Sequence, residues 1–202
     1  MANVDKPFGL KPVGHLTTGS FNGKVNIYYH HASDAVAIYR GDLVQMNETA
    51  GEAEPTGKYP SVIQHVAAQE DNVGVAVGFG STPQLAAINT NLNSPQYCPG
   101  STAMYIAVVD DPNVIFEIQE DSAGNAVTID EVGKFADVAV TAGSSTTGTS
   151  GMALDSDSAG ANGTLRIYRL ANREDNAIGD HAKWLVLINE HLWNHNENAI
   201  AA

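Results

Sequence analysis

The chain has 202 residues, with 10 Lys and Arg against 23 Asp and Glu, for a formal net charge of −13. A surface this acidic repels phosphate backbones, which argues against a nucleic-acid-binding protein. The single cysteine cannot form an intramolecular disulfide. No apolar run reaches the roughly 18 residues of a membrane helix, and no signal-peptide pattern is present. We therefore expect synthesis in the cytoplasm, with no nucleic-acid and no membrane partner.

Residues 1–24 contain Pro7, Pro12 and four glycines and have no sustained hydrophobic period. They also carry more large apolar side chains than a disordered tail usually holds. We expect an extended N-terminal arm over 1–24 and a single β-rich domain over 25–202. The alternative is that the arm folds back on its own body as an edge strand, because proline keeps it out of the centre of a sheet. The candidate residues for contact with a partner protein or sister subunit are Phe8, Leu10, Val13, Leu16 and Phe21.

Short strands are expected along the first half of the chain. An acidic loop at 47–58 separates them, and 80–100 has the prolines and polar residues of a loop. In 73–79, Val alternates with Gly and Ala, which indicates close approach by a neighbouring backbone or side chain. The expected strands cover residues 26–31, 35–39, 43–46, 61–66 and 73–79.

The stretch 105–121 predicts two strands joined by a tight turn at Asp110, Asp111, Pro112 and Asn113. The first strand is apolar on both faces, as in a strand covered on both sides. The second alternates large apolar residues with Glu117 and Gln119, which predicts one buried face and one wet or interfacial face. We expect a hairpin near the centre of the fold, with buried Val108, Phe116 and Ile118.

Thr128 and Glu131 have the spacing of a capping box and predict a short helix that reaches Ala136. The polar residues 141–150 are expected to form a surface loop. Further strands are expected at 137–140, 165–170 and 184–188. Roughly ten short strands and one short helix favour a mainly β protein, an antiparallel sandwich or barrel of jelly-roll-like form.

Candidate nucleophiles and paired carboxylates lack the neighbours that catalysis needs. Cys98 has no base near it in the sequence, so we interpret it as a structural residue. Acidic pairs such as Asp110 and Asp111 are more typical of solvated turns and strand faces than of a glycosidase. We expect no catalytic residue, and the protein is not expected to be an enzyme.

The candidate metal ligands likewise lack the neighbouring residues that a metal site needs. His191 and His195 are four apart, but no glutamate-bearing zinc motif surrounds them. Residues 155–160 begin like a calcium loop, yet Ala159 occupies its fifth position and Arg166 replaces the bidentate glutamate. We interpret that stretch as a turn and expect no metal and no cofactor.

Three segments follow one another along the chain, Asp5–His15, Val109–Ser122 and Arg173–His191. Together they resemble a family of tailed-bacteriophage structural proteins. The family is regarded as capsid-stabilising, decoration or cement proteins. The resemblance implies a virion protein made in the host cytoplasm that binds the outside of a capsid. It further implies the major capsid protein as partner and a homo-oligomer, a trimer or dimer at capsid symmetry axes. The chain departs from the family in its His- and Asn-rich tail after Glu190.

The composition agrees with this resemblance, and two alternatives remain. Strong acidity suits the outside of a particle better than its DNA-filled lumen. The first alternative is another virion component, such as a head fibre, a minor capsid protein or a tail protein. The second is a carbohydrate-binding module, which would need clustered exposed aromatic residues, whereas one of the two tryptophans, Trp184, lies on an expected core strand.

Overall fold

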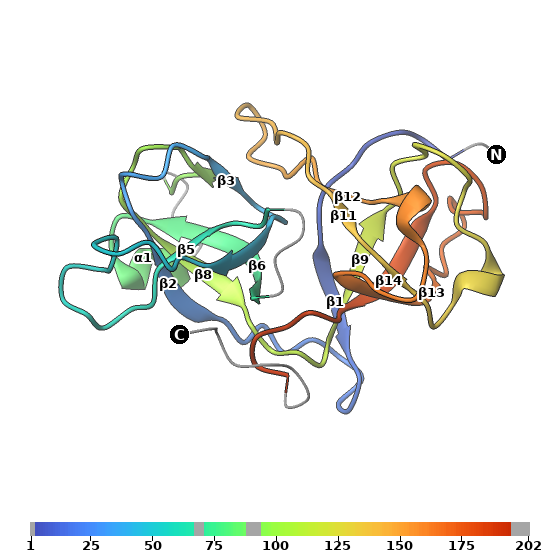
Figure 1. Cartoon of the computed structure of the whole chain (residues 1–202), viewed down its shortest axis with the longest axis horizontal. Coiled ribbons are helices and arrows are strands. Elements are labelled where there is room, and N and C mark those ends of the chain that lie inside the picture. Colours follow the sequence, from blue (N-terminus) through green and yellow to red (C-terminus); the bar gives the residue numbers. More distant parts are fainter. Residues whose placement is uncertain (1–2, 67–70, 88–93, 195–202) are drawn as a thin grey trace.

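A computed structural model describes residues 3–66, 71–87 and 94–194. The chain forms two β-rich lobes that lie side by side (Figure 1). Residues 26–66, 71–87 and 94–109 build the first lobe, and residues 3–21 together with 114–190 build the second. The chain thus starts in the second lobe, crosses to the first and returns. In the part of the chain that the structure describes, no helix is long and apolar enough to span a membrane.

The first lobe is built on a five-stranded antiparallel sheet in the order β2-β8-β6-β4-β5. A Cβ on Gly74 would lie 2.1 Å from the carbonyl oxygen of Val109, and one on Gly78 would lie 2.5 Å from that of Ala86. These contacts confirm the close approach expected from the small residues. The elements are β2 (Asn26–His30), β3 (Ile38–Tyr39), β4 (Leu43–Met46), β5 (Val62–Gln64), β6 (Asn72–Gly80), α1 (Pro83–Ala87), β7 (Tyr97–Cys98) and β8 (Met104–Val109).

The second lobe is built on another five-stranded antiparallel sheet, in the order β1-β9-β14-β13-β10, with the pair β11-β12 beside it. Trp184 is fully buried in its core together with Phe116 and Ile118. The elements are β1 (Lys11–His15), β9 (Val114–Gln119), β10 (Phe135–Ala136), β11 (Val138–Ala139), β12 (Ala153–Leu154), β13 (Leu165–Leu170) and β14 (Lys183–Ile188), with 3₁₀ turns at Ile129–Glu131 and Ser156–Ser158.

The mainly β, antiparallel architecture confirms the predicted fold class, and the expected central strands are present as β8 and β9. The predicted hairpin, however, is wrong. β8 pairs with β2 and β6, whereas β9 pairs with β1 and β14. Both hydrogen-bonding edges of each strand are therefore already occupied, and the turn between them links the two lobes. Val108, Phe116 and Ile118 are buried as predicted.

Of the two alternatives for the polar face of β9, a wet face does not occur, because all six residues of the strand are buried. Glu117 accepts a hydrogen bond from the guanidinium of Arg173 over 2.9 Å. The Gln119 amide group donates to the carbonyl oxygens of Val4 and His181 at 2.8 and 2.9 Å. Segments distant in sequence thus cover the polar face of the strand and supply its partners.

The short helix expected after Thr128 is reduced to a single 3₁₀ turn, although its capping box forms. Gly133, at φ +90°, follows the turn, and Phe135 exchanges two backbone hydrogen bonds with Gly160 at 3.0 and 2.8 Å. Strand pairing therefore takes over where the helix was expected to continue. The five-residue helix α1 instead begins at Pro83, a position that suits proline because its missing N–H has no helical partner.

The two lobes share core and backbone contacts. Leu43, Val75 and Val109 of the first sheet belong to the same hydrophobic cluster as Trp184. Loop residues Gly148 and Ser150 bond to the backbone of Arg40 at 3.0 and 2.9 Å. The end of the loop expected at the surface is therefore buried at the lobe junction. After β14 the chain returns to the first lobe, where the backbone N–H of Leu192 donates to the carbonyl oxygen of Asn72 over 2.8 Å.

Candidate functional site

The N-terminal segment is fixed to its own body. The Asn3 amide group donates to the carbonyl oxygens of Ala177 and Asp180, both at 2.9 Å. The backbone N–H of Lys6 donates to the side chain of Gln119 at 2.8 Å. β1 then pairs with β9 as the edge strand of the second sheet. Residues 11–15 therefore form an edge strand of the protein's own sheet, which was the alternative to a free arm.

The five candidate contact residues separate into three groups. Leu10 is 1% exposed and belongs to the second-lobe core, so it offers almost no surface to a partner; Phe21 packs half-buried against the same core. Val13 and Leu16 are 38% and 47% exposed. Phe8 is half-buried and lines a groove beside the N-terminal segment. Of the five candidates, Phe8, Val13 and Leu16 are therefore the ones that a partner could contact.

Two glycines bring the N-terminal segment against the first lobe. Gly9 has φ +69°, and a Cβ on it would lie 2.3 Å from the carbonyl oxygen of Gly41. Gly41 has φ +96°, and a Cβ there would lie 2.5 Å from the carbonyl oxygen of Phe8. Both positions favour glycine by conformation and by space. The two backbones touch here, and Gly41 lines the groove beside Phe8.

This junction groove has a volume of about 550 Å³. Residues of the N-terminal segment form one side, and Arg40, Gly41 and Val77 of the first lobe form part of the other. Its apolar lining residues, called the floor below, are Val4, Phe8, Leu10, Pro12 and Val77. Its five basic lining residues, called the rim below, are Lys6, Lys11, Arg40, Arg173 and Lys183.

The charge of the groove is opposite to that of the molecule. Five of the ten Lys and Arg residues of the chain line it, against two acidic residues, Glu117 and Asp175. Arg173 bonds both carboxylates at 2.9 Å, and its bond to Asp175 lowers the pKa of that carboxyl. Lys183 lies 3.5 Å from Asp175. The rim therefore has an excess of three positive charges in a strongly acidic chain.

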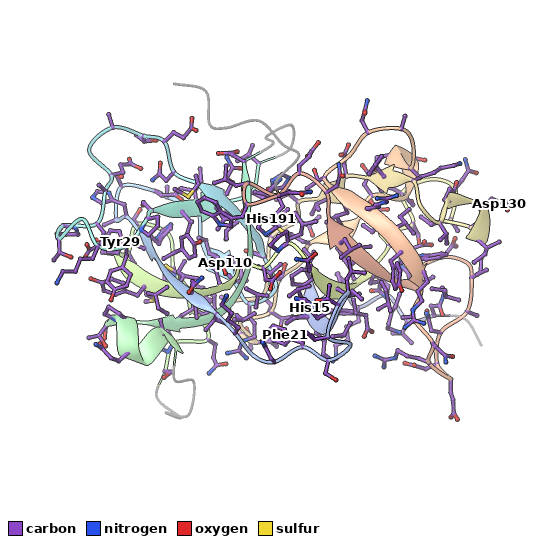
Figure 2. The ribbon with its side chains drawn as sticks, turned by 90° about the horizontal axis from the view of Figure 1, so that it is seen from below. His15, Phe21, Tyr29, Asp110, Asp130 and His191 are labelled. Atoms are coloured by element: carbon purple, nitrogen blue, oxygen red, sulfur yellow. The ribbon has the colours of Figure 1, made fainter. Side chains whose placement is uncertain are left out.

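A polar cluster lies at the turn between the lobes. The Tyr28 hydroxyl donates to Asp110 over 2.8 Å, and the Asn26 amide group donates to both Asp110 oxygens. Burial and Asp110 together raise the pKa of Tyr28. Trp193, 47% exposed, lines the same hollow. Figure 2 shows Asp110 and His191 in the middle of the molecule, between the two lobes. Both Asp110 oxygens already accept internal bonds, so this cluster ties β2 to the turn.

Sequence reasoning missed a Cys-His-Asp arrangement. The sulfur of Cys98 lies 3.3 Å from His30 Nδ1, and His30 Nε2 lies 3.1 Å from a carboxylate oxygen of Asp34. His30 is 68 residues from Cys98, so sequence proximity gave no signal. Both side chains are fully buried, and burial raises the pKa of the thiol to about 12. A nucleophilic cysteine needs a lowered pKa and access, so this arrangement has the features of core packing.

The structure describes one of the two histidines considered as metal ligands. His191 is fully buried at the lobe junction, and His195 lies outside the described residues. The Asp155 carboxylate accepts the backbone N–H of Asp157 at 3.0 Å and caps a 3₁₀ turn, as interpreted from the sequence. Within residues 3–66, 71–87 and 94–194, no group of three or more His, Cys, Asp or Glu side chains is arranged to hold a metal ion.

Comparison of the chain with protein-family models, with curated proteins and with solved structures finds no match.

Proposed function

We propose that the protein is a non-enzymatic structural component of a phage virion that binds the outside of the capsid and stabilises the shell. The observation that carries the proposal is the position of the segment Asp5–His15. This segment resembles capsid-stabilising proteins, and in the structure it lines an apolar, basic-rimmed groove. Its partner is then the major capsid protein, and a dimer or trimer would occupy the capsid symmetry axes.

Two physical features support this role. The net charge of −13 suits an exterior surface, where the protein does not compete for packaged DNA. The lobes share one hydrophobic cluster and exchange backbone bonds at 148–150 and at Leu192. A body connected in this way can transmit load between the capsid subunits to which it binds.

Binding to empty capsids tests the proposal. Purified protein is mixed with capsids that lack it, and bound protein is counted after sedimentation. We expect saturable binding with a copy number near that of the major capsid protein, together with a higher capsid melting temperature. A few copies per particle would favour a fibre, minor capsid or tail protein. Absence of binding would contradict the proposal.

A further inference from the structure

We propose that the junction groove binds an extended segment of the capsid shell protein in which apolar side chains are flanked by carboxylates. This inference rests on the proposed function and assigns its contact surface. The groove is the place where half of the basic residues of this acidic chain meet an apolar floor.

The floor selects for apolar side chains. Phe8 is half-buried, and Val4 is 71% exposed, so both can still lose contact with water when a ligand binds. Pro12 and Val77 complete an apolar surface between the lobes. A volume of about 550 Å³ lies within the range of about 300–1,000 Å³ that is usual for ligand sites. The groove can therefore accept a few side chains of an extended peptide.

The rim selects for negative charge. Lys6, Lys11 and Arg40 form no salt bridge with any residue in the described ranges. Carboxylates beside an apolar anchor would pair with these cations without displacing an existing ion pair. A nucleic acid fits less well, because the floor is apolar and the surrounding surface repels phosphate. An acidic, partly apolar peptide complements both floor and rim.

The groove is formed before any ligand binds. The Asn3 and Gln119 side chains hold the N-terminal segment in place, and the contact between Gly9 and Gly41 fixes it against the first lobe. A preformed site avoids the entropy loss of ordering a loop on binding. This rigidity favours an extended ligand that docks onto a fixed surface.

Charge reversal of the rim is the test. The variant Lys6→Glu/Lys11→Glu/Arg40→Glu is compared with the control Lys24→Glu/Lys58→Glu/Lys134→Glu. The control residues are exposed and lie outside the groove, and both variants change the net charge equally. In capsid sedimentation we expect the rim variant to lose at least about tenfold in affinity, because like charges would then face each other. The control is expected to stay within about twofold of the wild type.

If the charge-reversed rim variant does not fold, Lys6→Gln/Lys11→Gln/Arg40→Gln replaces it. The matching control is then Lys24→Gln/Lys58→Gln/Lys134→Gln. Its loss of affinity relative to the wild type should shrink as salt is raised from about 0.05 M to about 0.5 M, because salt screens the rim.

The outcomes separate the two proposals. If wild-type protein does not bind capsids, the proposed function fails and this inference fails with it. If wild-type, rim and control proteins bind equally, only the groove assignment is overturned. A wild-type dimer that dissociates in the rim variant, with capsid binding unchanged, would assign the groove to a second copy. A small amphipathic anion that co-purifies with the wild type but not with the rim variant, seen by native mass spectrometry, would also overturn the assignment.

Discussion

Glu120 is a buried carboxyl in the core of the second lobe. One of its oxygens accepts hydrogen bonds from the indole N–H of Trp184 at 2.9 Å and from the backbone N–H of Val127 at 3.1 Å. Burial outweighs these bonds and raises the pKa of Glu120 from its ordinary value of 4.5 to about 7. The folded protein thus keeps a proton on this side chain at a pH where the unfolded chain has released it.

Glu120→Gln is predicted to remove part of the pH dependence of stability. A raised folded-state pKa means that the contribution of Glu120 is full below about pH 4.5 and is lost as pH rises to about 7. Asp42 acts in the same direction and His191 in the opposite one, so the measured quantity is the difference between variant and wild type. Urea unfolding at pH 5 and pH 8 should show Gln gaining relative to Glu at the higher pH. An equal difference at both values would contradict the prediction.

Phe116→Ala is predicted to lower the free energy of unfolding by about 3–5 kcal/mol, since it would leave a cavity in the second-lobe core. Phe116 is 1% exposed and lies opposite Val186 on β14. Val132→Ala, at a side chain 39% exposed, is the control and should change stability by less than about 0.5 kcal/mol. Urea denaturation followed by tryptophan fluorescence measures both. Equal midpoints for the two variants would count against the position of Phe116 in the core.

Among the paired strands, β1 and β9 lie farthest apart in the sequence. Its residues pair with β9 from Lys11 opposite Glu117 to His15 opposite Val114, with a bulge between Pro12 and Gly14. Pro12 lacks an N–H, and its place on an edge strand agrees with the expectation that proline stays out of the sheet centre. The edge strand shields β9 from solvent.

Deletion of residues 2–22 is predicted to destabilise the protein strongly. The deletion removes β1, the core residue Leu10 and the half-buried Phe21, and it exposes an edge of β9. As a matched comparison, Val13→Ser/Leu16→Ser changes exposed side chains of the same segment and should leave the melting temperature close to that of the wild type. Thermal melts measure both. A truncated protein that melts at the wild-type temperature would refute the structural role of β1.

The sequence predicts local structure well and pairing poorly, and β8 and β9 show why. Hydrophobic period and turn chemistry locate both strands and the turn at Asp110, because these signals are encoded within a few residues. The choice of pairing partner depends on strands distant in sequence. Glu117 and Gln119 look solvent-facing for the same reason, since their partners Arg173 and Val4 are far away along the chain.

The groove was predictable only in part. The apolar residues of the N-terminal segment indicated a contact surface, and Phe8 does line the groove. The five basic residues of the rim are scattered through the sequence, from Lys6 to Lys183, and no local motif unites them. Folding alone brings them to one place. The net charge of the chain therefore does not indicate the sign of the charge at this groove.

At the scale of the whole molecule, the two lobes are coupled. The shared cluster contains Leu43, Val75 and Val109 from the first lobe, and the main chain crosses between lobes before β2 and after β8. Neither lobe can expose its side of this cluster without loss to the other. We expect the molecule to unfold in one cooperative step.

Two single-residue probes measure this prediction, one in each lobe. Cys98 is the chain's only cysteine and is buried in the first lobe, whereas Trp184 is buried in the second. In a Trp193→Phe background, Trp184 fluorescence and the thiol reactivity of Cys98 should report the same urea midpoint. Thiol labelling at clearly lower urea than the fluorescence change would show that the first lobe opens independently.

The path of the chain has a consequence for synthesis on the ribosome. β1 ends at His15, and its partner β9 begins at Val114, roughly 100 residues later. At about 5–20 residues per second, that interval lasts on the order of 5–20 s. The strands of the first lobe are continuous in sequence and are all synthesised in this time, while Leu10 and Phe21 remain without the core residues against which they pack. The nascent N-terminal segment is therefore the stretch that a chaperone would meet first.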